Sequence, residues 1–460
     1  MKKIAIILSV SAFFIFSLNH VTKADEISNL KEQLKAMQAE MREQARKMTE
    51  MQQKIEKLET GQAASGRKPV VAEKPAKPEK PAGEGIRVYW RDGLRFETAD
   101  KEFTLKAGGR IQADFGAMAQ DSEVKGRLGK IDKPAEFRRL RVYGSGSVFE
   151  NGVYKAQVDF ADGEVAFRDV YIGLKGIPYI DLLRVGQFTE PFSLEDMTSS
   201  NHITFLERSL PYALSIHRQT GLGFNSAHFN KRVTFSASSF FNADDLARPE
   251  SNALNFATRL TGLPFYENEG EKLLHLGVAY CFRNPPDKEN FRYNSPPEIH
   301  LAPNFVDTGD FDAKFANLLG LESVLIYGPF SLQSEFIQSF VDLKGTSQTG
   351  YFNGFYASAS YFLTGEHRNY DKFWAAFSGV KPHKNFSLKD WSLGALELAA
   401  RYSYLDLSSH DVNGRALSDI TVGCNWYLNP AMKVMFNYVH AHPNGVGDAD
   451  IVAVRCQFYY

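Results

Sequence analysis

Most of the chain after Gly85 consists of short segments in which apolar and polar residues alternate. A period of two places successive side chains on opposite faces of a β-strand. In the last nine residues, one face takes the apolar and aromatic residues Val452, Val454, Cys456, Phe458 and Tyr460. An apolar, aromatic face opposite a polar face is typical of strands that separate lipid from water. Comparable segments recur at 103–116, 137–149, 153–161, 166–176, 220–229, 232–242, 272–282, 330–342, 350–363, 396–404, 417–428 and 432–440.

The length of this region predicts the number of strands. At roughly 23 residues per strand and connection, residues 86–460 give about 16 strands, an even number as in bacterial outer-membrane barrels. A barrel of that width encloses a water-filled lumen rather than a packed core. The pattern therefore predicts an all-β fold, a transmembrane antiparallel β-barrel that forms a pore. The aromatic last residue, Tyr460, lies on the outward face, as is common in such barrels.

The residues before the barrel follow other patterns. Residues 25–60 carry apolar residues in heptad spacing, which predicts an α-helical coiled coil for oligomerisation. Residues 61–85 contain four Lys-Pro pairs, which block helix and predict an extended linker. Residues 1–24 begin with Lys2 and Lys3 and continue with an apolar run and a small-residue cleavage site, which predicts a signal peptide. The coiled coil is therefore expected in the periplasm.

Composition and charge exclude several classes of protein. The chain has 36 Phe, 20 Tyr and 4 Trp without a second long apolar run, which suits lipid-facing strands. A net charge of −1 disfavours a nucleic-acid binder. Three scattered cysteines fit neither a disulfide framework nor a zinc site, and His440 and His442 are expected in a turn. We expect no cofactor and no metal.

Strand parity assigns side chains to the lumen. Because Ile111 and Phe115 face lipid, Arg110 is expected to face inward. The same parity turns Arg139 and Arg141 inward and puts Arg138 on the lipid side, where it would snorkel at the rim. The other inward basic residues by this rule are Lys155, Lys175, Arg184, Arg259, Arg401, Lys433 and Arg455, against the inward acids Asp114, Asp159, Asp169 and Glu397.

This basic excess favours anions in the lumen. The alternative is that inward arginines pair with inward carboxylates and only brace the wall.

Residues 190–218 do not alternate and contain their own apolar and charged residues. Ser193 followed three residues later by Asp196 predicts a capped helical turn. A long connection of this kind is more often functional than idle. We expect it to fold into the lumen and set the constriction; the alternative is an external loop on the rim.

Several motifs resemble the phosphate-selective porin O and P family. The most specific is the run Gly186-Gln187-Phe188-Thr189-Glu190-Pro191-Phe192-Ser193-Leu194-Glu195. Supporting motifs occupy residues 137–141, 170–175, 198–201, 205–211, 218–221, 363–368, 397–403 and 425–430. The resemblance implies a 16-stranded trimeric barrel whose third loop narrows an anion path, with Arg139, Arg141, Arg208 and Arg218 toward the channel. The chain departs from the family pattern at residues 215–218.

The resulting hypothesis is an outer-membrane porin for passive diffusion of small anions, with phosphate or polyphosphate as candidate solutes. Its path would be lined by Arg110, Arg139, Arg141, Lys155, Arg208, Arg218 and Arg401. The expected partners are two further copies of the chain, outer-membrane lipid and, through the N-terminal segment, the cell wall.

Two alternatives of the same cellular location are a non-selective diffusion porin and a tether between outer membrane and cell wall with the barrel as anchor. A barrel enzyme is disfavoured because the serines and histidines form no catalytic motif.

Overall fold

The structure is a computed structural model that describes residues 43, 46, 85–90, 93–285 and 290–460. The chain divides into two units, Met1–Glu79 and Lys80–Tyr460, and the second contains the whole sheet. The predicted signal peptide (1–24), the linker before Gly85 and the coiled coil (25–60), apart from Glu43 and Arg46, lie outside the described residues.

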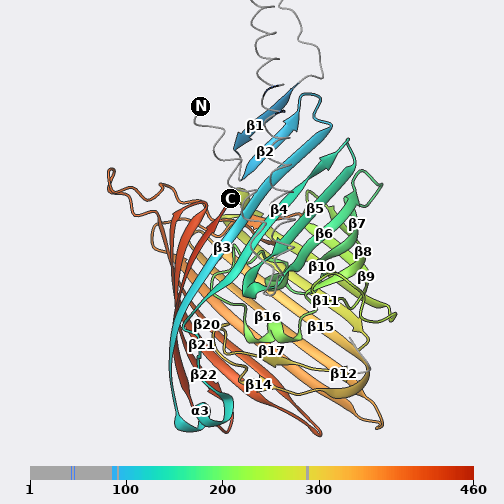
Figure 1. Cartoon of the computed structure of the whole chain (residues 1–460), viewed down its shortest axis with the longest axis vertical. Coiled ribbons are helices and arrows are strands. Elements are labelled where there is room, and N and C mark those ends of the chain that lie inside the picture. Colours follow the sequence, from blue (N-terminus) through green and yellow to red (C-terminus); the bar gives the residue numbers. More distant parts are fainter. Residues whose placement is uncertain (1–42, 44–45, 47–84, 91–92, 286–289) are drawn as a thin grey trace, which may run out of the picture. The chain divides into compact units, whose positions relative to one another are not determined.

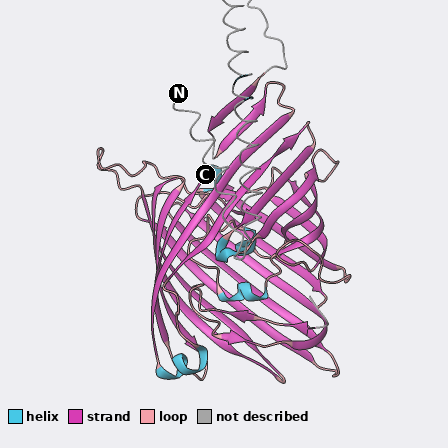
Figure 2. Ribbon diagram, in the orientation of Figure 1, coloured by secondary structure: helices cyan, strands magenta, loops and turns pink. Residues whose placement is uncertain are grey.

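Sixteen long antiparallel strands form a closed barrel (Figures 1 and 2), so the predicted fold class and strand number are confirmed. Each strand pairs with the next along the chain, and β23 closes the barrel on β3, with Tyr459 opposite Arg110. The strands are β3 (Phe103–Gln120), β4 (Ala135–Val148), β5 (Gly152–Asp159), β6 (Ala166–Leu174), β7 (Leu182–Thr189), β8 (Arg218–His228), β9 (Val233–Phe241), β10 (Asn255–Glu267), β11 (Lys272–Arg283), β15 (Phe311–Tyr327), β16 (Phe330–Leu343), β17 (Thr349–Phe362), β20 (Ala395–Ser409), β21 (Val412–Asn429), β22 (Met432–Pro443) and β23 (Ala449–Tyr459).

The smaller elements lie in connections or before the barrel. A hairpin of β1 (Ile86–Trp90) and β2 (Leu94–Thr98) pairs with the start of β3, on the edge that β23 occupies further along. Among the described residues, no helix is long and apolar enough to cross a membrane. The short strands are β12 (Asn290–Phe291), β13 (Asn294–Ser295), β14 (Val306–Asp307), β18 (Tyr370–Asp371) and β19 (Ala376–Phe377); the helical turns are α3 (Ser122–Leu128), η2 (Ala161–Gly163), α4 (Leu194–Met197), η3 (Leu210–Leu214) and η4 (Asn268–Gly270).

The turns at the barrel end where β3 begins and β23 ends are short, with one exception, whereas most of the connections at the other end are longer. Short turns mark the periplasmic end of bacterial barrels. The exception joins β17 to β20 and spans residues 363–394, which we call the inner segment. It meets inward side chains of the wall: Arg259 donates hydrogen bonds to the carbonyls of Trp374 and Ala375, and Asn225 donates to that of Phe373.

The connection between β7 and β8 also enters the barrel, and we call residues 190–217 the inward loop. Its turns α4 and η3 appear inside the barrel in Figure 2. Its apolar side chains Phe192, Phe205, Leu206 and Leu210 are at most 2% exposed. These side chains are buried within the barrel rather than exposed on its rim. That the loop sets the constriction stays a prediction.

The inward loop packs on glycines of the opposite wall. A Cβ at Gly320 on β15 would lie 3.5 Å from the Phe192 ring, and a Cβ at Gly354 on β17 would lie 3.1 Å from Pro211. On β21, a Cβ at Gly423 would lie 3.4 Å from the Phe205 ring. Since these positions carry no side chain, the loop can approach the β15–β21 wall closely, and the open part of the lumen is left on the β3–β8 side.

Candidate functional site

A cavity of about 650 Å³ lies between the inward loop and the inner faces of β3 to β8. The inner segment contributes Asp371, Trp374 and Phe377 to its lining. Five aspartates line it in total, against nine arginines and lysines. The nine are Arg110, Arg138, Arg139, Arg141, Lys155, Arg168, Arg184, Arg208 and Arg218.

Six of the seven residues proposed from sequence for the solute path line this one cavity. Strands β3 to β8 supply Arg110, Arg139, Arg141, Lys155 and Arg218, and the inward loop supplies Arg208. The seventh, Arg401, lies elsewhere in the lumen, in ion pairs with Glu195 (3.2 Å) and Glu298 (2.6 Å). Lys175, also expected inward, follows the end of β6 and is exposed in a turn.

The expectation that Arg138 points to lipid is wrong. The pairing of β3 with β4 shifts register between Gln112 and Ala113, so that Arg139 faces Gln112, Phe137 faces Ala113, and Arg138 is the extra residue of a β-bulge. A bulge turns its extra residue away from strict alternation. The side chain therefore points inward, and its Nε donates a 2.9 Å hydrogen bond to Glu207.

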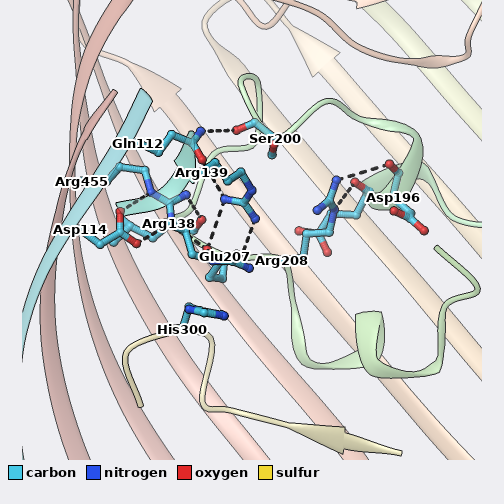
Figure 3. Close-up of polar contacts among 12 residues, drawn as sticks. Gln112, Asp114, Arg138, Arg139, Asp196, Ser200, Glu207, Arg208, His300 and Arg455 are labelled. Carbon is cyan, nitrogen blue, oxygen red and sulfur yellow. Dashed lines mark hydrogen bonds and ion pairs between the residues drawn. The ribbon is translucent and has the colours of Figure 1, made fainter. Parts of the chain in front are cut away.

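Glu207 of the inward loop binds arginines from two strands, β4 and β23 (Figure 3). Besides Arg138, it accepts hydrogen bonds from Arg139 (3.2 Å) and Arg455 (2.7 Å). Arg455 also pairs with Asp114 at 2.6 Å. Burial raises the pKa of Glu207, but the three guanidinium groups outweigh burial and hold that pKa well below its usual value. The carboxylate is therefore charged and ties the loop to the wall.

Other contacts fix the inward loop. The Ser193 side chain accepts a hydrogen bond from the backbone N–H of Asp196, so the predicted helical cap is confirmed. The carboxylate of Glu335 on β16 accepts from the backbone N–H groups of Leu194 (3.0 Å) and Glu195 (2.9 Å). A carboxylate at a helix N-terminus satisfies donors that have no partner within the helix.

A second cavity of about 340 Å³ lies on the other side of the inward loop, against the connection between β11 and β15. Arg138, Arg208, Tyr212 and His217 line both cavities, so they lie where the two cavities adjoin. The Arg208 guanidinium lies 4.7 Å from the Tyr212 ring and donates to the carbonyls of Glu195 and Thr198. The His217 ring lies 4.2 Å from the Tyr212 ring, and its Nδ1 lies 3.4 Å from Asp196.

The basic residues of the larger cavity fall into two groups. In the first, each has a carboxylate partner: Arg141 pairs with Asp159 (2.6 Å), and both Lys155 (2.5 Å) and Arg218 (2.8 Å) pair with Asp169. In the second, Arg110, Arg184 and Arg208 have no carboxylate of the described residues within ion-pair distance. Arg110 instead donates to the hydroxyl of Ser200 (2.5 Å). Some arginines therefore brace the wall, and others have no direct ion-pair partner among the described residues.

The inner segment also lines the cavity with Trp374, Phe377 and Ser378, which were not predicted from the sequence as site residues. A signal was present, since residues 363–394 lack alternation for longer than any periplasmic turn requires. It is the same signal that identified the inward loop.

Comparisons with known proteins extend over the whole barrel. The chain is 27% identical to Porin O of Pseudomonas aeruginosa over 430 residues, which cover 82% of this chain and 93% of that protein. It is 28% identical over 384 residues to an uncharacterized protein of Caulobacter vibrioides, covering 80% and 74% of the two chains. In fold it is similar to a loop L8 deletion mutant of OmpT, an outer-membrane protein of Vibrio cholerae, with a TM-score of 0.51 at 12% identity over 78% of this chain and all of that one.

The match to a family model has the same extent. Residues 105–460, from β3 to the last residue, match the model for phosphate-selective porins O and P. A porin is a channel rather than an enzyme. The chain therefore belongs to the phosphate-selective porin O and P family of the outer membrane.

Proposed function

We propose that this porin is a passive channel for small anions, and that they pass between the inward loop and the β3–β8 wall. The observation that carries the proposal is the charge of the larger cavity, nine arginines and lysines against five aspartates. Charges of one sign in a low-dielectric wall concentrate ions of the opposite sign and exclude ions of the same sign. The two cavities adjoin through Arg138, Arg208, Tyr212 and His217, which would form the constriction.

Arg110 is the strongest candidate for direct contact with the anion. Its guanidinium has hydroxyl partners, Ser200 at 2.5 Å and Ser199 at 3.5 Å, rather than a carboxylate. A passing oxyanion could replace either hydroxyl without separating an ion pair. Charge-assisted hydrogen bonds from arginine to an oxyanion are stronger than those to a neutral hydroxyl.

Phosphate or polyphosphate is the proposed solute. The support is membership of a family described as phosphate-selective, and the basic lining suits any small oxyanion. A non-selective diffusion porin is the alternative, because many of the arginines are neutralised by Asp159 and Asp169.

We also propose that the protein assembles as a homotrimer, with residues 25–60 forming a coiled coil in the periplasm. The heptad spacing of that segment supports a coiled coil but does not decide between two and three helices. The support for three copies is the resemblance to a family of trimeric porins. The four Lys-Pro pairs of residues 61–85 suit a spacer between barrel and helix, and through them the N-terminal segment could contact the cell wall.

The experiment is the reversal potential of the purified protein in planar bilayers under a KCl gradient. We expect an anion-biased potential that moves toward zero in Arg110→Gln and is unchanged in Arg232→Gln, an exposed arginine in the turn between β8 and β9. Added phosphate should reduce the chloride current.

A cation-biased potential would contradict the anion channel and leave a general porin. If correctly folded protein gives no channels, the tether becomes the better hypothesis.

A further inference from the structure

Arg184 on β7 differs from the other basic residues of the larger cavity in its surroundings. Its guanidinium carbon lies 4.2 Å from the ring centre of Phe188, 4.9 Å from that of Trp374 and 5.5 Å from that of Tyr171. The residue is 6% exposed and lines the cavity. Among the described residues its Nε has no hydrogen-bond partner, and no carboxylate lies within ion-pair distance. A buried cation that lacks a carboxylate partner and borders an open cavity is suited to bind an anion.

This cation is well separated from Arg110. The two residues stand on β7 and β3, four strand spacings apart, which corresponds to roughly 19 Å along the wall. The strands between them carry Lys155 on β5 and its carboxylate partner Asp169 on β6. An anion held by Arg184 would therefore occupy a different place from one held by Arg110.

Trp374 is held in position by the inner segment. The Asp371 carboxylate accepts hydrogen bonds from the backbone N–H groups of Phe373 (2.8 Å) and Trp374 (3.2 Å). Arg259 on β10 donates to the carbonyl of Trp374 (3.2 Å) from the wall. The backbone that carries the indole ring is therefore held in place beside Arg184 before any ligand enters.

The surroundings of Arg184 favour one class of anion. A strongly hydrated inorganic oxyanion needs several donors to replace its water, whereas this place offers one guanidinium among aromatic rings. A carboxylate on a planar aromatic body suits it better, because the carboxylate can accept two parallel hydrogen bonds from the guanidinium while its ring packs against an aromatic side chain. Trp374 and Phe377 line the same cavity and supply such rings.

We propose that Arg184 and Trp374 form a second anion subsite that binds aromatic carboxylates. The proposal rests on the anion passage proposed above, because the ligand must enter through it. The subsite would bind aromatic carboxylates on the periplasmic side of the cavity, and the inner segment would contribute to that binding through Trp374.

The test compares benzoate with cyclohexanecarboxylate as blockers of the chloride current in planar bilayers. The two anions are close in size and charge, and only benzoate is planar and aromatic. We expect benzoate to block at a concentration about five-fold lower, which is the order of advantage that an aromatic contact provides. Trp374→Leu should abolish this difference. Trp391→Leu, which removes a 92% exposed tryptophan of the same segment, should preserve it.

A second variant tests the subsite even if Trp374→Leu fails to fold. Arg184→Lys keeps the charge but loses the planar group, so it should also abolish the preference for benzoate. Equal block by the two anions in the wild type, or a preference that survives in both folded variants, would overturn the subsite. The reversal potential in the same bilayers separates the two hypotheses: equal block with an anion-biased potential rejects only the subsite, and a cation-biased potential rejects the anion passage itself.

Discussion

At the scale of single residues, the carboxylate of Glu207 allows three arginine side chains to lie close together between the inward loop and the wall. Arg138, Arg139 and Arg455 would repel one another at this spacing, and the carboxylate lies among all three. Removing one partner of a buried charge pair leaves the other charge uncompensated, which destabilises a protein far more than losing an exposed pair.

We therefore expect Glu207→Gln to lower the free energy of unfolding by about 3 kcal/mol. The measurement is urea unfolding in detergent micelles, followed by tryptophan fluorescence. Glu123→Gln removes the exposed pair with Arg127 and is the matched control, for which little change is expected. Equal effects of the two substitutions would contradict a structural role for Glu207.

Glu190, at the start of the inward loop, predicts a pH dependence of stability. Burial raises its pKa to about 8, although Ser238 donates a hydrogen bond to the carboxylate. The protonated form is therefore preferred in the folded barrel, and the corresponding contribution is complete below the ordinary pKa of an unfolded glutamate. It is lost as the pH rises through about 8.

The wild type should accordingly lose stability relative to Glu190→Gln between pH 5 and pH 9, as measured by urea unfolding across that range. The exposed Glu164, substituted in the same way, should leave the pH profile unchanged. Parallel profiles for the wild type and Glu190→Gln would show that Glu190 is ionised throughout.

At the scale of elements, the side of the lumen that the inward loop occupies depends on glycines. Phe192, Pro211 and Phe205 pack where Gly320, Gly354 and Gly423 leave the β15–β21 wall without side chains. A larger side chain at such a position would move the loop toward the basic wall and narrow the passage.

Gly320→Leu should therefore reduce single-channel conductance, since a leucine there would meet Phe192. Gly262→Leu on β10 is the control, because a Cβ at Gly262 has no atom within 4 Å. An unchanged conductance in Gly320→Leu, together with normal folding, would show that the loop does not depend on this glycine for its position.

Alternation predicted most strands but not β7, β10 or β15, and for β10 and β15 the structure shows a physical cause. Strand β15 was not singled out because its inner face is largely apolar: Ala313, Leu318 and Val324 are buried beneath inward segments, so the two faces look alike in sequence. Strand β10 contains an irregularity in its pairing with β11 between Gly262 and Phe265, which interrupts the period of two.

Like the strands, the inward side chains of the candidate site were predictable only where alternation holds. Parity located Arg110, Arg139 and Arg141 on the inner face, because the register from Arg110–Arg141 to Gln112–Arg139 is unbroken. It failed at Arg138, because a bulge is not visible in alternation. It could not show that Arg401 would be covered by Glu195 and Glu298, because those contacts come from two separate connections.

At the scale of the whole molecule, the barrel is complete without the N-terminal residues. Among the residues that the structure describes, all pairings of the sheet involve Ile86 and later residues. The predicted coiled coil would then act on assembly rather than on conduction.

Deletion of residues 25–84 should leave single-channel conductance unchanged, because no residue of the passage is removed. It should lower the temperature at which the proposed trimer dissociates, as seen on heated semi-native gels, since the heptad seam would no longer hold the copies together. A changed conductance would mean that the N-terminal segment takes part in the channel.

The strand pairing at the closing seam, where β23 and β2 both meet β3, limits how the chain can be extended after Tyr460. Tyr460 exchanges two backbone hydrogen bonds with Gly109 (3.0 and 3.1 Å), while Leu94 of β2 pairs with Ala107, two residues back along β3. Both β23 and β2 are antiparallel to β3 on the same edge, so the end of one strand faces the beginning of the other along a single line. Residues added after Tyr460 cannot continue in that line, and a C-terminal affinity tag would have to leave the sheet or displace β2. An exposed two-residue turn such as His410–Asp411 is the better place for a tag.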